Sequence, residues 1–107
     1  MRSKLYYSVL LVLISQMAIS QNLTQTIKGI VIDKENRRPL AGATVSIADD
    51  STQQTVLSNE AGGFMLKNIL VGRRRIQCTY SGYENYITDN ILLNSAREVE
   101  LIIELEQ

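Results

Sequence analysis

The sequence predicts an all-β fold, a sandwich of seven short strands. Apolar and polar residues alternate with a period of two in several segments, which is typical of half-buried strands. Turn-forming clusters rich in Gly, Asn and Asp separate these segments at roughly even spacing. With a single cysteine among 107 residues, no internal disulfide is available, so packing and sheet hydrogen bonds must hold the fold. The expected strands are 26–33, 43–48, 54–58, 64–67, 74–80, 83–88 and 98–106.

A polar run and a proline separate the first two expected strands. Segment 26–33 is rich in isoleucine and ends in the polar run 34–38, which indicates a turn. Pro39 follows, and because proline cannot donate to a ladder it belongs to the loop before the next strand. Segment 43–48 then alternates, with Ala43, Val45 and Ile47 predicted to face the core.

The central segments indicate two further pairs of strands. Segment 54–58 and segment 64–67 flank the turn 59–63, where a glycine can adopt positive φ, so we expect them to form a hairpin. In segment 74–80, Ile76, Cys78 and Tyr80 share one face. Cys78 is therefore expected to be a buried core thiol rather than a reactive one.

The last element, 98–106, fits either a helix or a strand by composition. Its Glu and Leu content favours a helix, and Ser95 with Glu98 matches a capping box. However, apolar residues alternate with glutamates throughout, and only Ile102 breaks the period of two. A helix would spread these apolar positions around its circumference, so we predict a strand.

Residues 1–20 resemble a cleavable signal peptide. Arg2 and Lys4 precede the apolar run 5–14, and small residues at 18 and 20 place the cut before Gln21. A membrane anchor is the alternative, but a spanning helix needs about 20 apolar residues and the run is half as long. We expect 21–25 to be a flexible segment and 26–107 to be the folded domain.

Charge and residue inventory argue against an enzyme and against nucleic-acid binding. Without Arg2 and Lys4, the remaining 87 residues carry 9 basic and 11 acidic side chains, which gives no basic surface for nucleic acid. The chain has no His, the commonest general base and metal ligand. We therefore expect no catalytic residues, no cofactor and no metal. Asp33, Glu35 and Asn36 fit a turn better than part of a calcium loop, and Asp49 and Asp50 fit solvated loop charges.

Two short polar stretches are candidates for contact or modification. Arg73, Arg74 and Arg75 form the densest charge run, and they indicate either a docking face for an acidic partner or a solvated sheet edge. Arg74 would share a face with Ile76 and extend its guanidinium to solvent. Asp50-Ser51-Thr52 is similar to a bacterial O-glycosylation signal, a side hypothesis that the intact mass of the exported protein would test.

Five stretches in order resemble the carboxypeptidase-regulatory-like domain family, over about 26–106. They are Lys28-Gly29-Ile30-Val31-Ile32-Asp33, Pro39-Leu40-Ala41-Gly42-Ala43-Thr44-Val45, Asn59-Glu60-Ala61-Gly62-Gly63-Phe64, Gly72, and Tyr80-Ser81-Gly82-Tyr83-Glu84. The resemblance implies a transthyretin-like, immunoglobulin-like Greek-key sandwich. Ser58-Asn59 and the arginine run depart from the family's usual pattern, and both departures fall in loops. The expected turn and core positions are Gly29, Pro39, Gly42, Gly62, Phe64, Gly72, Gly82 and Tyr83.

The secretion signal and the tail 92–101 resemble the N-terminal extension of TonB-dependent, SusC-like outer-membrane transporters. This resemblance implies a periplasmic location and a transporter's plug and barrel, or other envelope proteins, as partners. The alternative is a free-standing periplasmic or surface module that binds a carbohydrate or a protein through loops or a strand edge. The reading frame beyond Gln107 would separate the two hypotheses.

Overall fold

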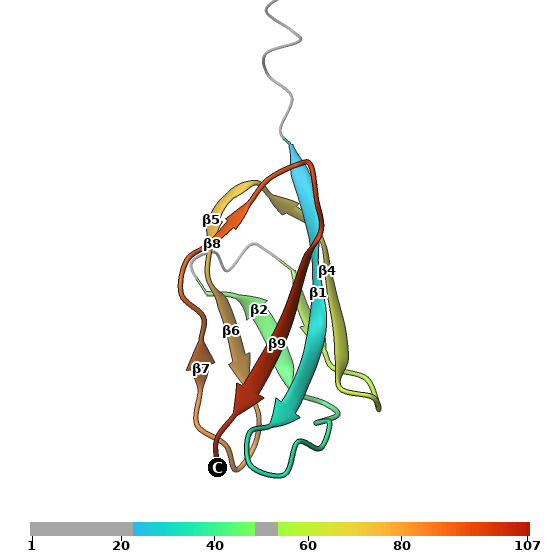
Figure 1. The fold of residues 1–107 in the computed structure, drawn as a ribbon, viewed down its shortest axis with the longest axis vertical. Coiled ribbons are helices and arrows are strands. Elements are labelled where there is room, and N and C mark those ends of the chain that lie inside the picture. The colour runs from blue at the N-terminus through green and yellow to red at the C-terminus, as the bar shows by residue number, and fades with distance from the viewer. Residues whose placement is uncertain (1–22, 49–53) are drawn as a thin grey trace, which may run out of the picture.

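The computed structural model describes residues 23–48 and 54–107, which form nine β-strands (Figure 1). No helix in these two ranges is long and apolar enough to cross a membrane. The strands are β1 (Thr24–Asp33), β2 (Thr44–Ile47), β3 (Thr55–Leu57), β4 (Gly63–Leu70), β5 (Gly72–Arg74), β6 (Ile76–Thr79), β7 (Tyr86–Ile87), β8 (Ile91–Leu93) and β9 (Val99–Leu105).

Two sheets and a short ribbon make up the fold. The first sheet has the order β4-β1-β9, in which β1 is antiparallel to β4 and parallel to β9. The second has the order β3-β2-β6-β7, with every pair antiparallel. Strands β5 and β8 form the ribbon, at the end of the molecule where β1 begins (Figure 1). The predicted all-β sandwich is confirmed.

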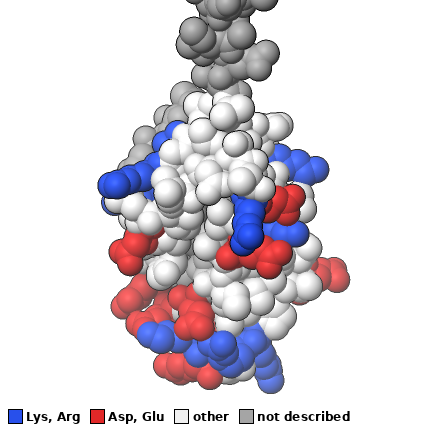
Figure 2. Space-filling model, turned by 45° about the horizontal axis from the view of Figure 1, so that its top comes forward, with Lys and Arg blue, Asp and Glu red and all other residues white. Residues whose placement is uncertain are grey.

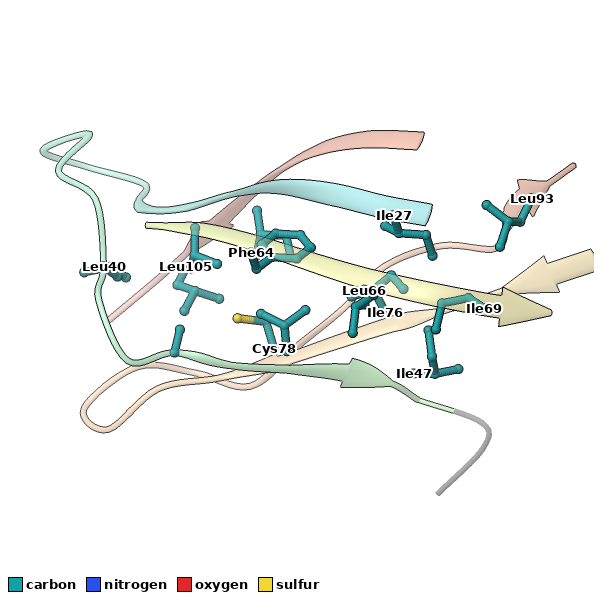
Figure 3. Packing of buried hydrophobic residues seen from close by; sticks show 14 residues of the cluster. Ile27, Leu40, Ile47, Phe64, Leu66, Ile69, Ile76, Cys78, Leu93 and Leu105 are labelled. Carbon is teal, nitrogen blue, oxygen red and sulfur yellow. The ribbon is translucent and has the colours of Figure 1, made fainter. Parts of the chain in front are cut away.

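The core lies between the two sheets and is built by the alternation that the sequence shows. Ala43, Val45 and Ile47 are at most 4% exposed, as predicted for the 43–48 strand. Figure 3 shows side chains from both sheets, including those of Phe64 and Cys78, gathered in this interior. Strand β9 confirms the choice of strand over helix, since it pairs with β1 in continuous register from Val99 to Leu105.

The predicted strand 74–80 is divided in two. Strand β5 pairs with β8, whereas β6 leaves that ribbon and pairs with β2 and β7. The break falls at Arg75, whose carbonyl oxygen accepts a hydrogen bond from Ala48 N (2.8 Å) beyond the end of β2. Strand β8 is not among the expected strands. It has only three residues, which is too short for an alternation of apolar and polar residues to be recognised.

The predicted hairpin between 54–58 and 64–67 is wrong. The turn between them forms as expected, closed by Asn59 N to Gly63 O (2.8 Å). However, β3 pairs with β2 and β4 pairs with β1, so the turn passes the chain from one sheet to the other. Buried Ser58 explains the crossing: its hydroxyl accepts from Ala43 N (2.9 Å) and donates to Leu40 O (2.6 Å), which fixes the end of β3 beside the start of β2.

The ends of two predicted segments also differ. Strand β1 begins at Thr24, with Thr24 opposite Leu70 and Gln25 opposite Ile69, so the end of the segment expected to be flexible is held in the sheet. The strand predicted over 83–88 is only two residues long, because Tyr83 N donates to Tyr80 O (3.0 Å) and extends the turn. The predicted signal peptide, residues 1–20, and the Asp50-Ser51-Thr52 stretch lie outside the described residues.

Candidate functional site

Four exposed apolar side chains, three on the outer face of the β4-β1-β9 sheet and one from β3, line one hollow and form what we call the outer patch: Ile30, Leu57, Met65 and Ile102. Their exposed fractions are 39%, 66%, 45% and 63%. Ile30 lies opposite both Gly63 of β4 and Ile102 of β9, so one row across the sheet is apolar and has no side chain at its β4 position. Leu57 comes from β3 of the other sheet.

An open hollow of about 840 Å³ lies over the outer patch. The side chain missing at Gly63 helps to shape it, and Lys28, Asn59 and Glu100 add polar groups at its rim. An apolar centre with a polar rim is the usual anatomy of a protein contact surface. The aromatic residue among its lining residues, Phe64, is 6% exposed and belongs to the core.

The charges around the outer patch are paired within the chain. Lys28 Nζ lies 3.1 Å from Glu98 Oε2 and 3.5 Å from Glu100 Oε1. The hydrogen bond to Glu98, followed by the attraction of both carboxylates, raises the pKa of Lys28 above its usual 10.5. Figure 2 shows positive and negative side chains interleaved on the visible face, with wide uncharged areas between them. The centre of this surface is therefore uncharged and suits an apolar side chain of a partner, while the charges lie at its rim.

A second hollow, of about 410 Å³, runs beside β9 on the side away from β1. Glu84, Asn85 and Tyr86 form one wall, and Glu104 and Glu106 form part of the other. Ile102 lines this hollow and the first one. The residue that breaks the alternation of the last strand thus lies at the junction of both hollows. The sequence showed that irregularity but gave no reason for it.

The end of the sandwich near Asp33 is closed by a hydrogen-bond network. Asp33 is 4% exposed, and its Oδ1 accepts from Glu35 N (2.8 Å) and Asn36 N (3.1 Å). Tyr83 donates its hydroxyl to Asp33 Oδ2 (2.6 Å). This bond, with those from the backbone, lowers the pKa of Asp33 below 3.8, and the carboxylate raises the pKa of Tyr83 above 10.0. The turn interpretation of 33–36 is confirmed, but the sequence did not reveal the partnership with Tyr83.

The arginine run is dispersed by the break in the strand. Arg74 donates Nε to Leu70 O (2.9 Å) and a terminal nitrogen to Val71 O (3.2 Å), so its guanidinium caps backbone carbonyls. Arg73 lies opposite Leu92 in the ribbon, and Arg75 follows in the break. Both are exposed. The three arginines therefore do not form one face, and a docking role for them stays a prediction.

The remaining predicted positions are structural. Pro39 forms an isolated bridge with Ile32. Gly62 has φ +78°, and a Cβ there would lie 2.5 Å from Val31 O. Gly29 lies within β1, not in a turn, and a Cβ there would overlap the carbonyl oxygen of Leu101 in β9. Gly42, Gly72 and Gly82 also have positive φ, which glycine adopts without steric cost.

Two features bear on whether the described residues could form a reactive site: the burial of the thiol and the grouping of metal-ligand side chains. Cys78 is fully buried, and burial raises the pKa of its thiol to about 11, so the nucleophilic thiolate is scarce at neutral pH. Within 23–48 and 54–107, no three His, Cys, Asp or Glu side chains are grouped as metal ligands would be. The outer patch and the adjacent edge of β9 are the exposed features that we consider as candidate contact surfaces.

The family model for the carboxypeptidase regulatory-like domain matches residues 26–106. The chain belongs to this family. The match covers all nine strands except the first two residues of β1, and it agrees with the five stretches quoted above. A search of curated proteins found no match to the sequence.

Solved structures with a similar fold include a pilin, a cohesin–X–dockerin complex and a putative carbohydrate-binding protein. The major pilin subunit of Bacillus cereus matches with a TM-score of 0.63 at 21% identity, over 79% of this chain and 30% of the pilin chain. A type II cohesin–X–dockerin complex from Acetivibrio cellulolyticus matches with a TM-score of 0.62 at 18% identity, over 76% and 56%. A putative carbohydrate-binding protein from Bacteroides uniformis matches with a TM-score of 0.61 at 10% identity, over 78% and 41%. This carboxypeptidase regulatory-like domain spans little more than half of these chains at most, and the likeness shows the fold alone.

Proposed function

We propose that this domain is a non-catalytic, exported accessory module that acts by contact. More specifically, we propose that it is the periplasmic N-terminal extension of a TonB-dependent outer-membrane nutrient transporter. The observation that carries the contact role is the outer patch, where four apolar side chains stay exposed around one open hollow. The family match supports it.

The transporter assignment rests on the resemblance of the signal segment and of the tail leading into β9. A domain in this position would fold next to the plug and contact periplasmic proteins through its free surfaces. Its partners would then be the plug, the barrel or other envelope proteins. The fold suits such a role because stability comes from a closed core, leaving the outer face of the β4-β1-β9 sheet free.

A free-standing binding module is the second candidate, and the outer patch also favours it. A protein ligand fits this surface better than a carbohydrate. Sugar recognition needs polar groups converging on the ligand, whereas the hollow over the patch is lined mostly by apolar side chains.

Fractionation of the native cells separates the two candidates. An antiserum against the domain should detect a polypeptide far longer than 107 residues in the outer-membrane fraction if the transporter assignment holds. A soluble periplasmic species of the size of the domain alone would contradict it and support the free-standing module. A detergent-free osmotic extract gives the matched control, since it releases soluble periplasmic proteins and leaves barrels behind.

Peptidase activity is the outcome that would overturn the non-catalytic assignment. The purified chain should leave a mixed peptide library intact with and without a chelator. Cleavage that is lost on chelation would show a metal site that the described residues do not form. A family member that carries the catalytic peptidase domain provides the positive control.

A further inference from the structure

The side of β9 that faces away from β1 is a free sheet edge. Among the described residues β9 pairs only with β1. Beyond the end of β9, the carbonyl of Glu106 turns to the opposite side and accepts from Glu84 N (2.7 Å). Because backbone groups alternate along a strand, those of Glu100, Ile102 and Glu104 also face this side. The edge therefore offers donors and acceptors to an added strand.

The inner face of β9 is covered at one end and open at the other. Ile103 and Leu105 are 1% exposed. Val99 and Leu101 point to the same interior but are only partly buried. The residues Val99–Ile102, which we call the open half, thus combine an unpaired edge with an incompletely covered apolar face. An added strand would cover both.

The charges of β9 set the chemistry that this edge accepts. Four glutamates lie along β9 and its two flanking positions: Glu98, Glu100, Glu104 and Glu106. Only three cations form ion pairs with them: Lys28, Lys34 and Arg37. One carboxylate is therefore in excess. Lys28 is shared between Glu98 and Glu100, and the Glu100 side chain is 77% exposed. Glu100 is thus the position where a basic residue would complete the charge balance.

A second copy of this chain is a poor occupant of the same edge. Two β9 strands paired antiparallel with Ile102 opposite Ile102 would place Glu100 opposite Glu104 of the other copy. A parallel in-register pair would place each glutamate opposite itself. Like charges directly opposite each other destabilise a strand pair, so the edge disfavours self-pairing.

We propose that the open half of β9 binds an extended protein segment as an added strand. The segment carries an apolar residue opposite Ile102 and a Lys or Arg opposite Glu100, two positions away on the same face. Its alternate side chains cover Val99 and Leu101. The proposal rests on the proposed contact function and narrows the contact to one edge and one partner chemistry.

A palindromic heptapeptide tests the proposal with the purified full chain. Lys, Val and Lys occupy its second, fourth and sixth positions, and Thr or Val the others, so it presents the same face in either strand direction. A matched peptide has Glu in place of both Lys residues. Fluorescence anisotropy of the labelled peptides measures affinity, and amide chemical shifts locate the contact.

The Lys peptide should bind at least about tenfold more tightly than the Glu peptide, because only the former meets Glu100 with opposite charge. The amide shifts should lie along β9 and be largest in residues 99–102. Glu100→Lys should abolish or reverse the preference, whereas the control Glu60→Lys, the same charge change in an exposed turn, should keep it. Circular dichroism verifies that both variants are folded.

Three results would overturn the proposal. The first is no binding of either peptide at millimolar concentration, and the second is equal binding of both. The third is binding that shifts the amides of β3 or β4 in place of those of β9. None of them bears on the fractionation result, so the edge can fail as a docking site while the exported accessory role stands.

Discussion

The two halves of β9 share one sheet and one partner strand but differ in how they are covered. In the residues 103–106, which we call the closing half, Ile103 and Leu105 are buried. Leu105 O accepts a hydrogen bond from Lys34 N (3.0 Å), and Glu106 O accepts one from Glu84 N (2.7 Å). In the open half, Val99 and Leu101 are partly exposed. The contrast teaches that a single strand can be structural at one end and available for contact at the other.

The difference follows from which segments lie beyond each half. The chain returns past the closing half twice, in the turn after β1 and in the segment leading to β7, and the Asp33–Tyr83 hydrogen bond joins these two passes. No described segment pairs with the free edge of the open half. Substitutions in the two halves should therefore affect stability and binding differently.

The largest contrast is expected between two truncations in β9. Ile103→Ala should lower the free energy of unfolding by about 2 to 5 kcal/mol, because it empties a fully buried site in a domain without a disulfide. Leu101→Ala should cost distinctly less, since its side chain already contacts solvent. Urea denaturation measures both. Equal midpoints for the two variants would remove the distinction between the halves.

Gly29→Ala tests what holds the open half against β1. The added methyl would overlap Leu101 O, and the neighbouring backbone cannot move without disturbing the parallel ladder. Overpacking of this kind costs about 1 to 3 kcal/mol. Gly42→Ala is the comparison, because a Cβ there meets nothing within 4 Å and the substitution carries only the strain of positive φ. If Gly42→Ala lowers the free energy of unfolding more than Gly29→Ala does, the close approach of Leu101 O is not the reason that position 29 requires glycine.

Tyr83→Phe should weaken the closing half by a smaller and pH-dependent amount. The folded-state pKa of Asp33 is lowered below 3.8, so the bond's contribution to stability is present above that pH and is lost as the pH falls through the lower folded value. The pKa of Tyr83 is raised above 10.0, so the contribution is also lost as the pH rises past that raised value. Thermal unfolding across pH should show the two proteins differing most between these limits. A difference that persists undiminished at pH 2 would show that the bond to the carboxylate is not its source.

Period-two alternation predicted most of this fold because it reports directly on burial. It identified the inward faces of β2, β6 and β9, as well as the buried thiol of Cys78. It does not predict strand pairing. The hairpin expected between 54–58 and 64–67 is therefore wrong, because the Ser58 hydrogen bonds hold β3 beside β2, in a different sheet from β4. The Asp33–Tyr83 contact joins residues 50 positions apart and leaves no local pattern.

In the sequence, the only sign of the candidate surface is one break in the alternation of apolar and polar residues. Ile102 interrupts the glutamate alternation of the last strand, and a single irregular residue does not say whether it is buried or exposed. The structure places it at 63% exposure, beside Ile30 of β1 and between the two hollows. The arginine run, more conspicuous in sequence, is dispersed because the chain changes sheets at Arg75.

Ile102→Thr should have the smallest effect on stability and a clear effect on contact. Threonine keeps the β-branched shape that suits a strand, and substitutions on an exposed surface usually change stability by less than about 0.5 kcal/mol. If the open half binds an added strand, the same variant should weaken binding of the Lys peptide without moving the urea midpoint. A loss of stability comparable to that of Ile103→Ala would show that Ile102 is covered in the folded chain. Ile102 would then contribute to packing, and the two halves of β9 would no longer differ in role.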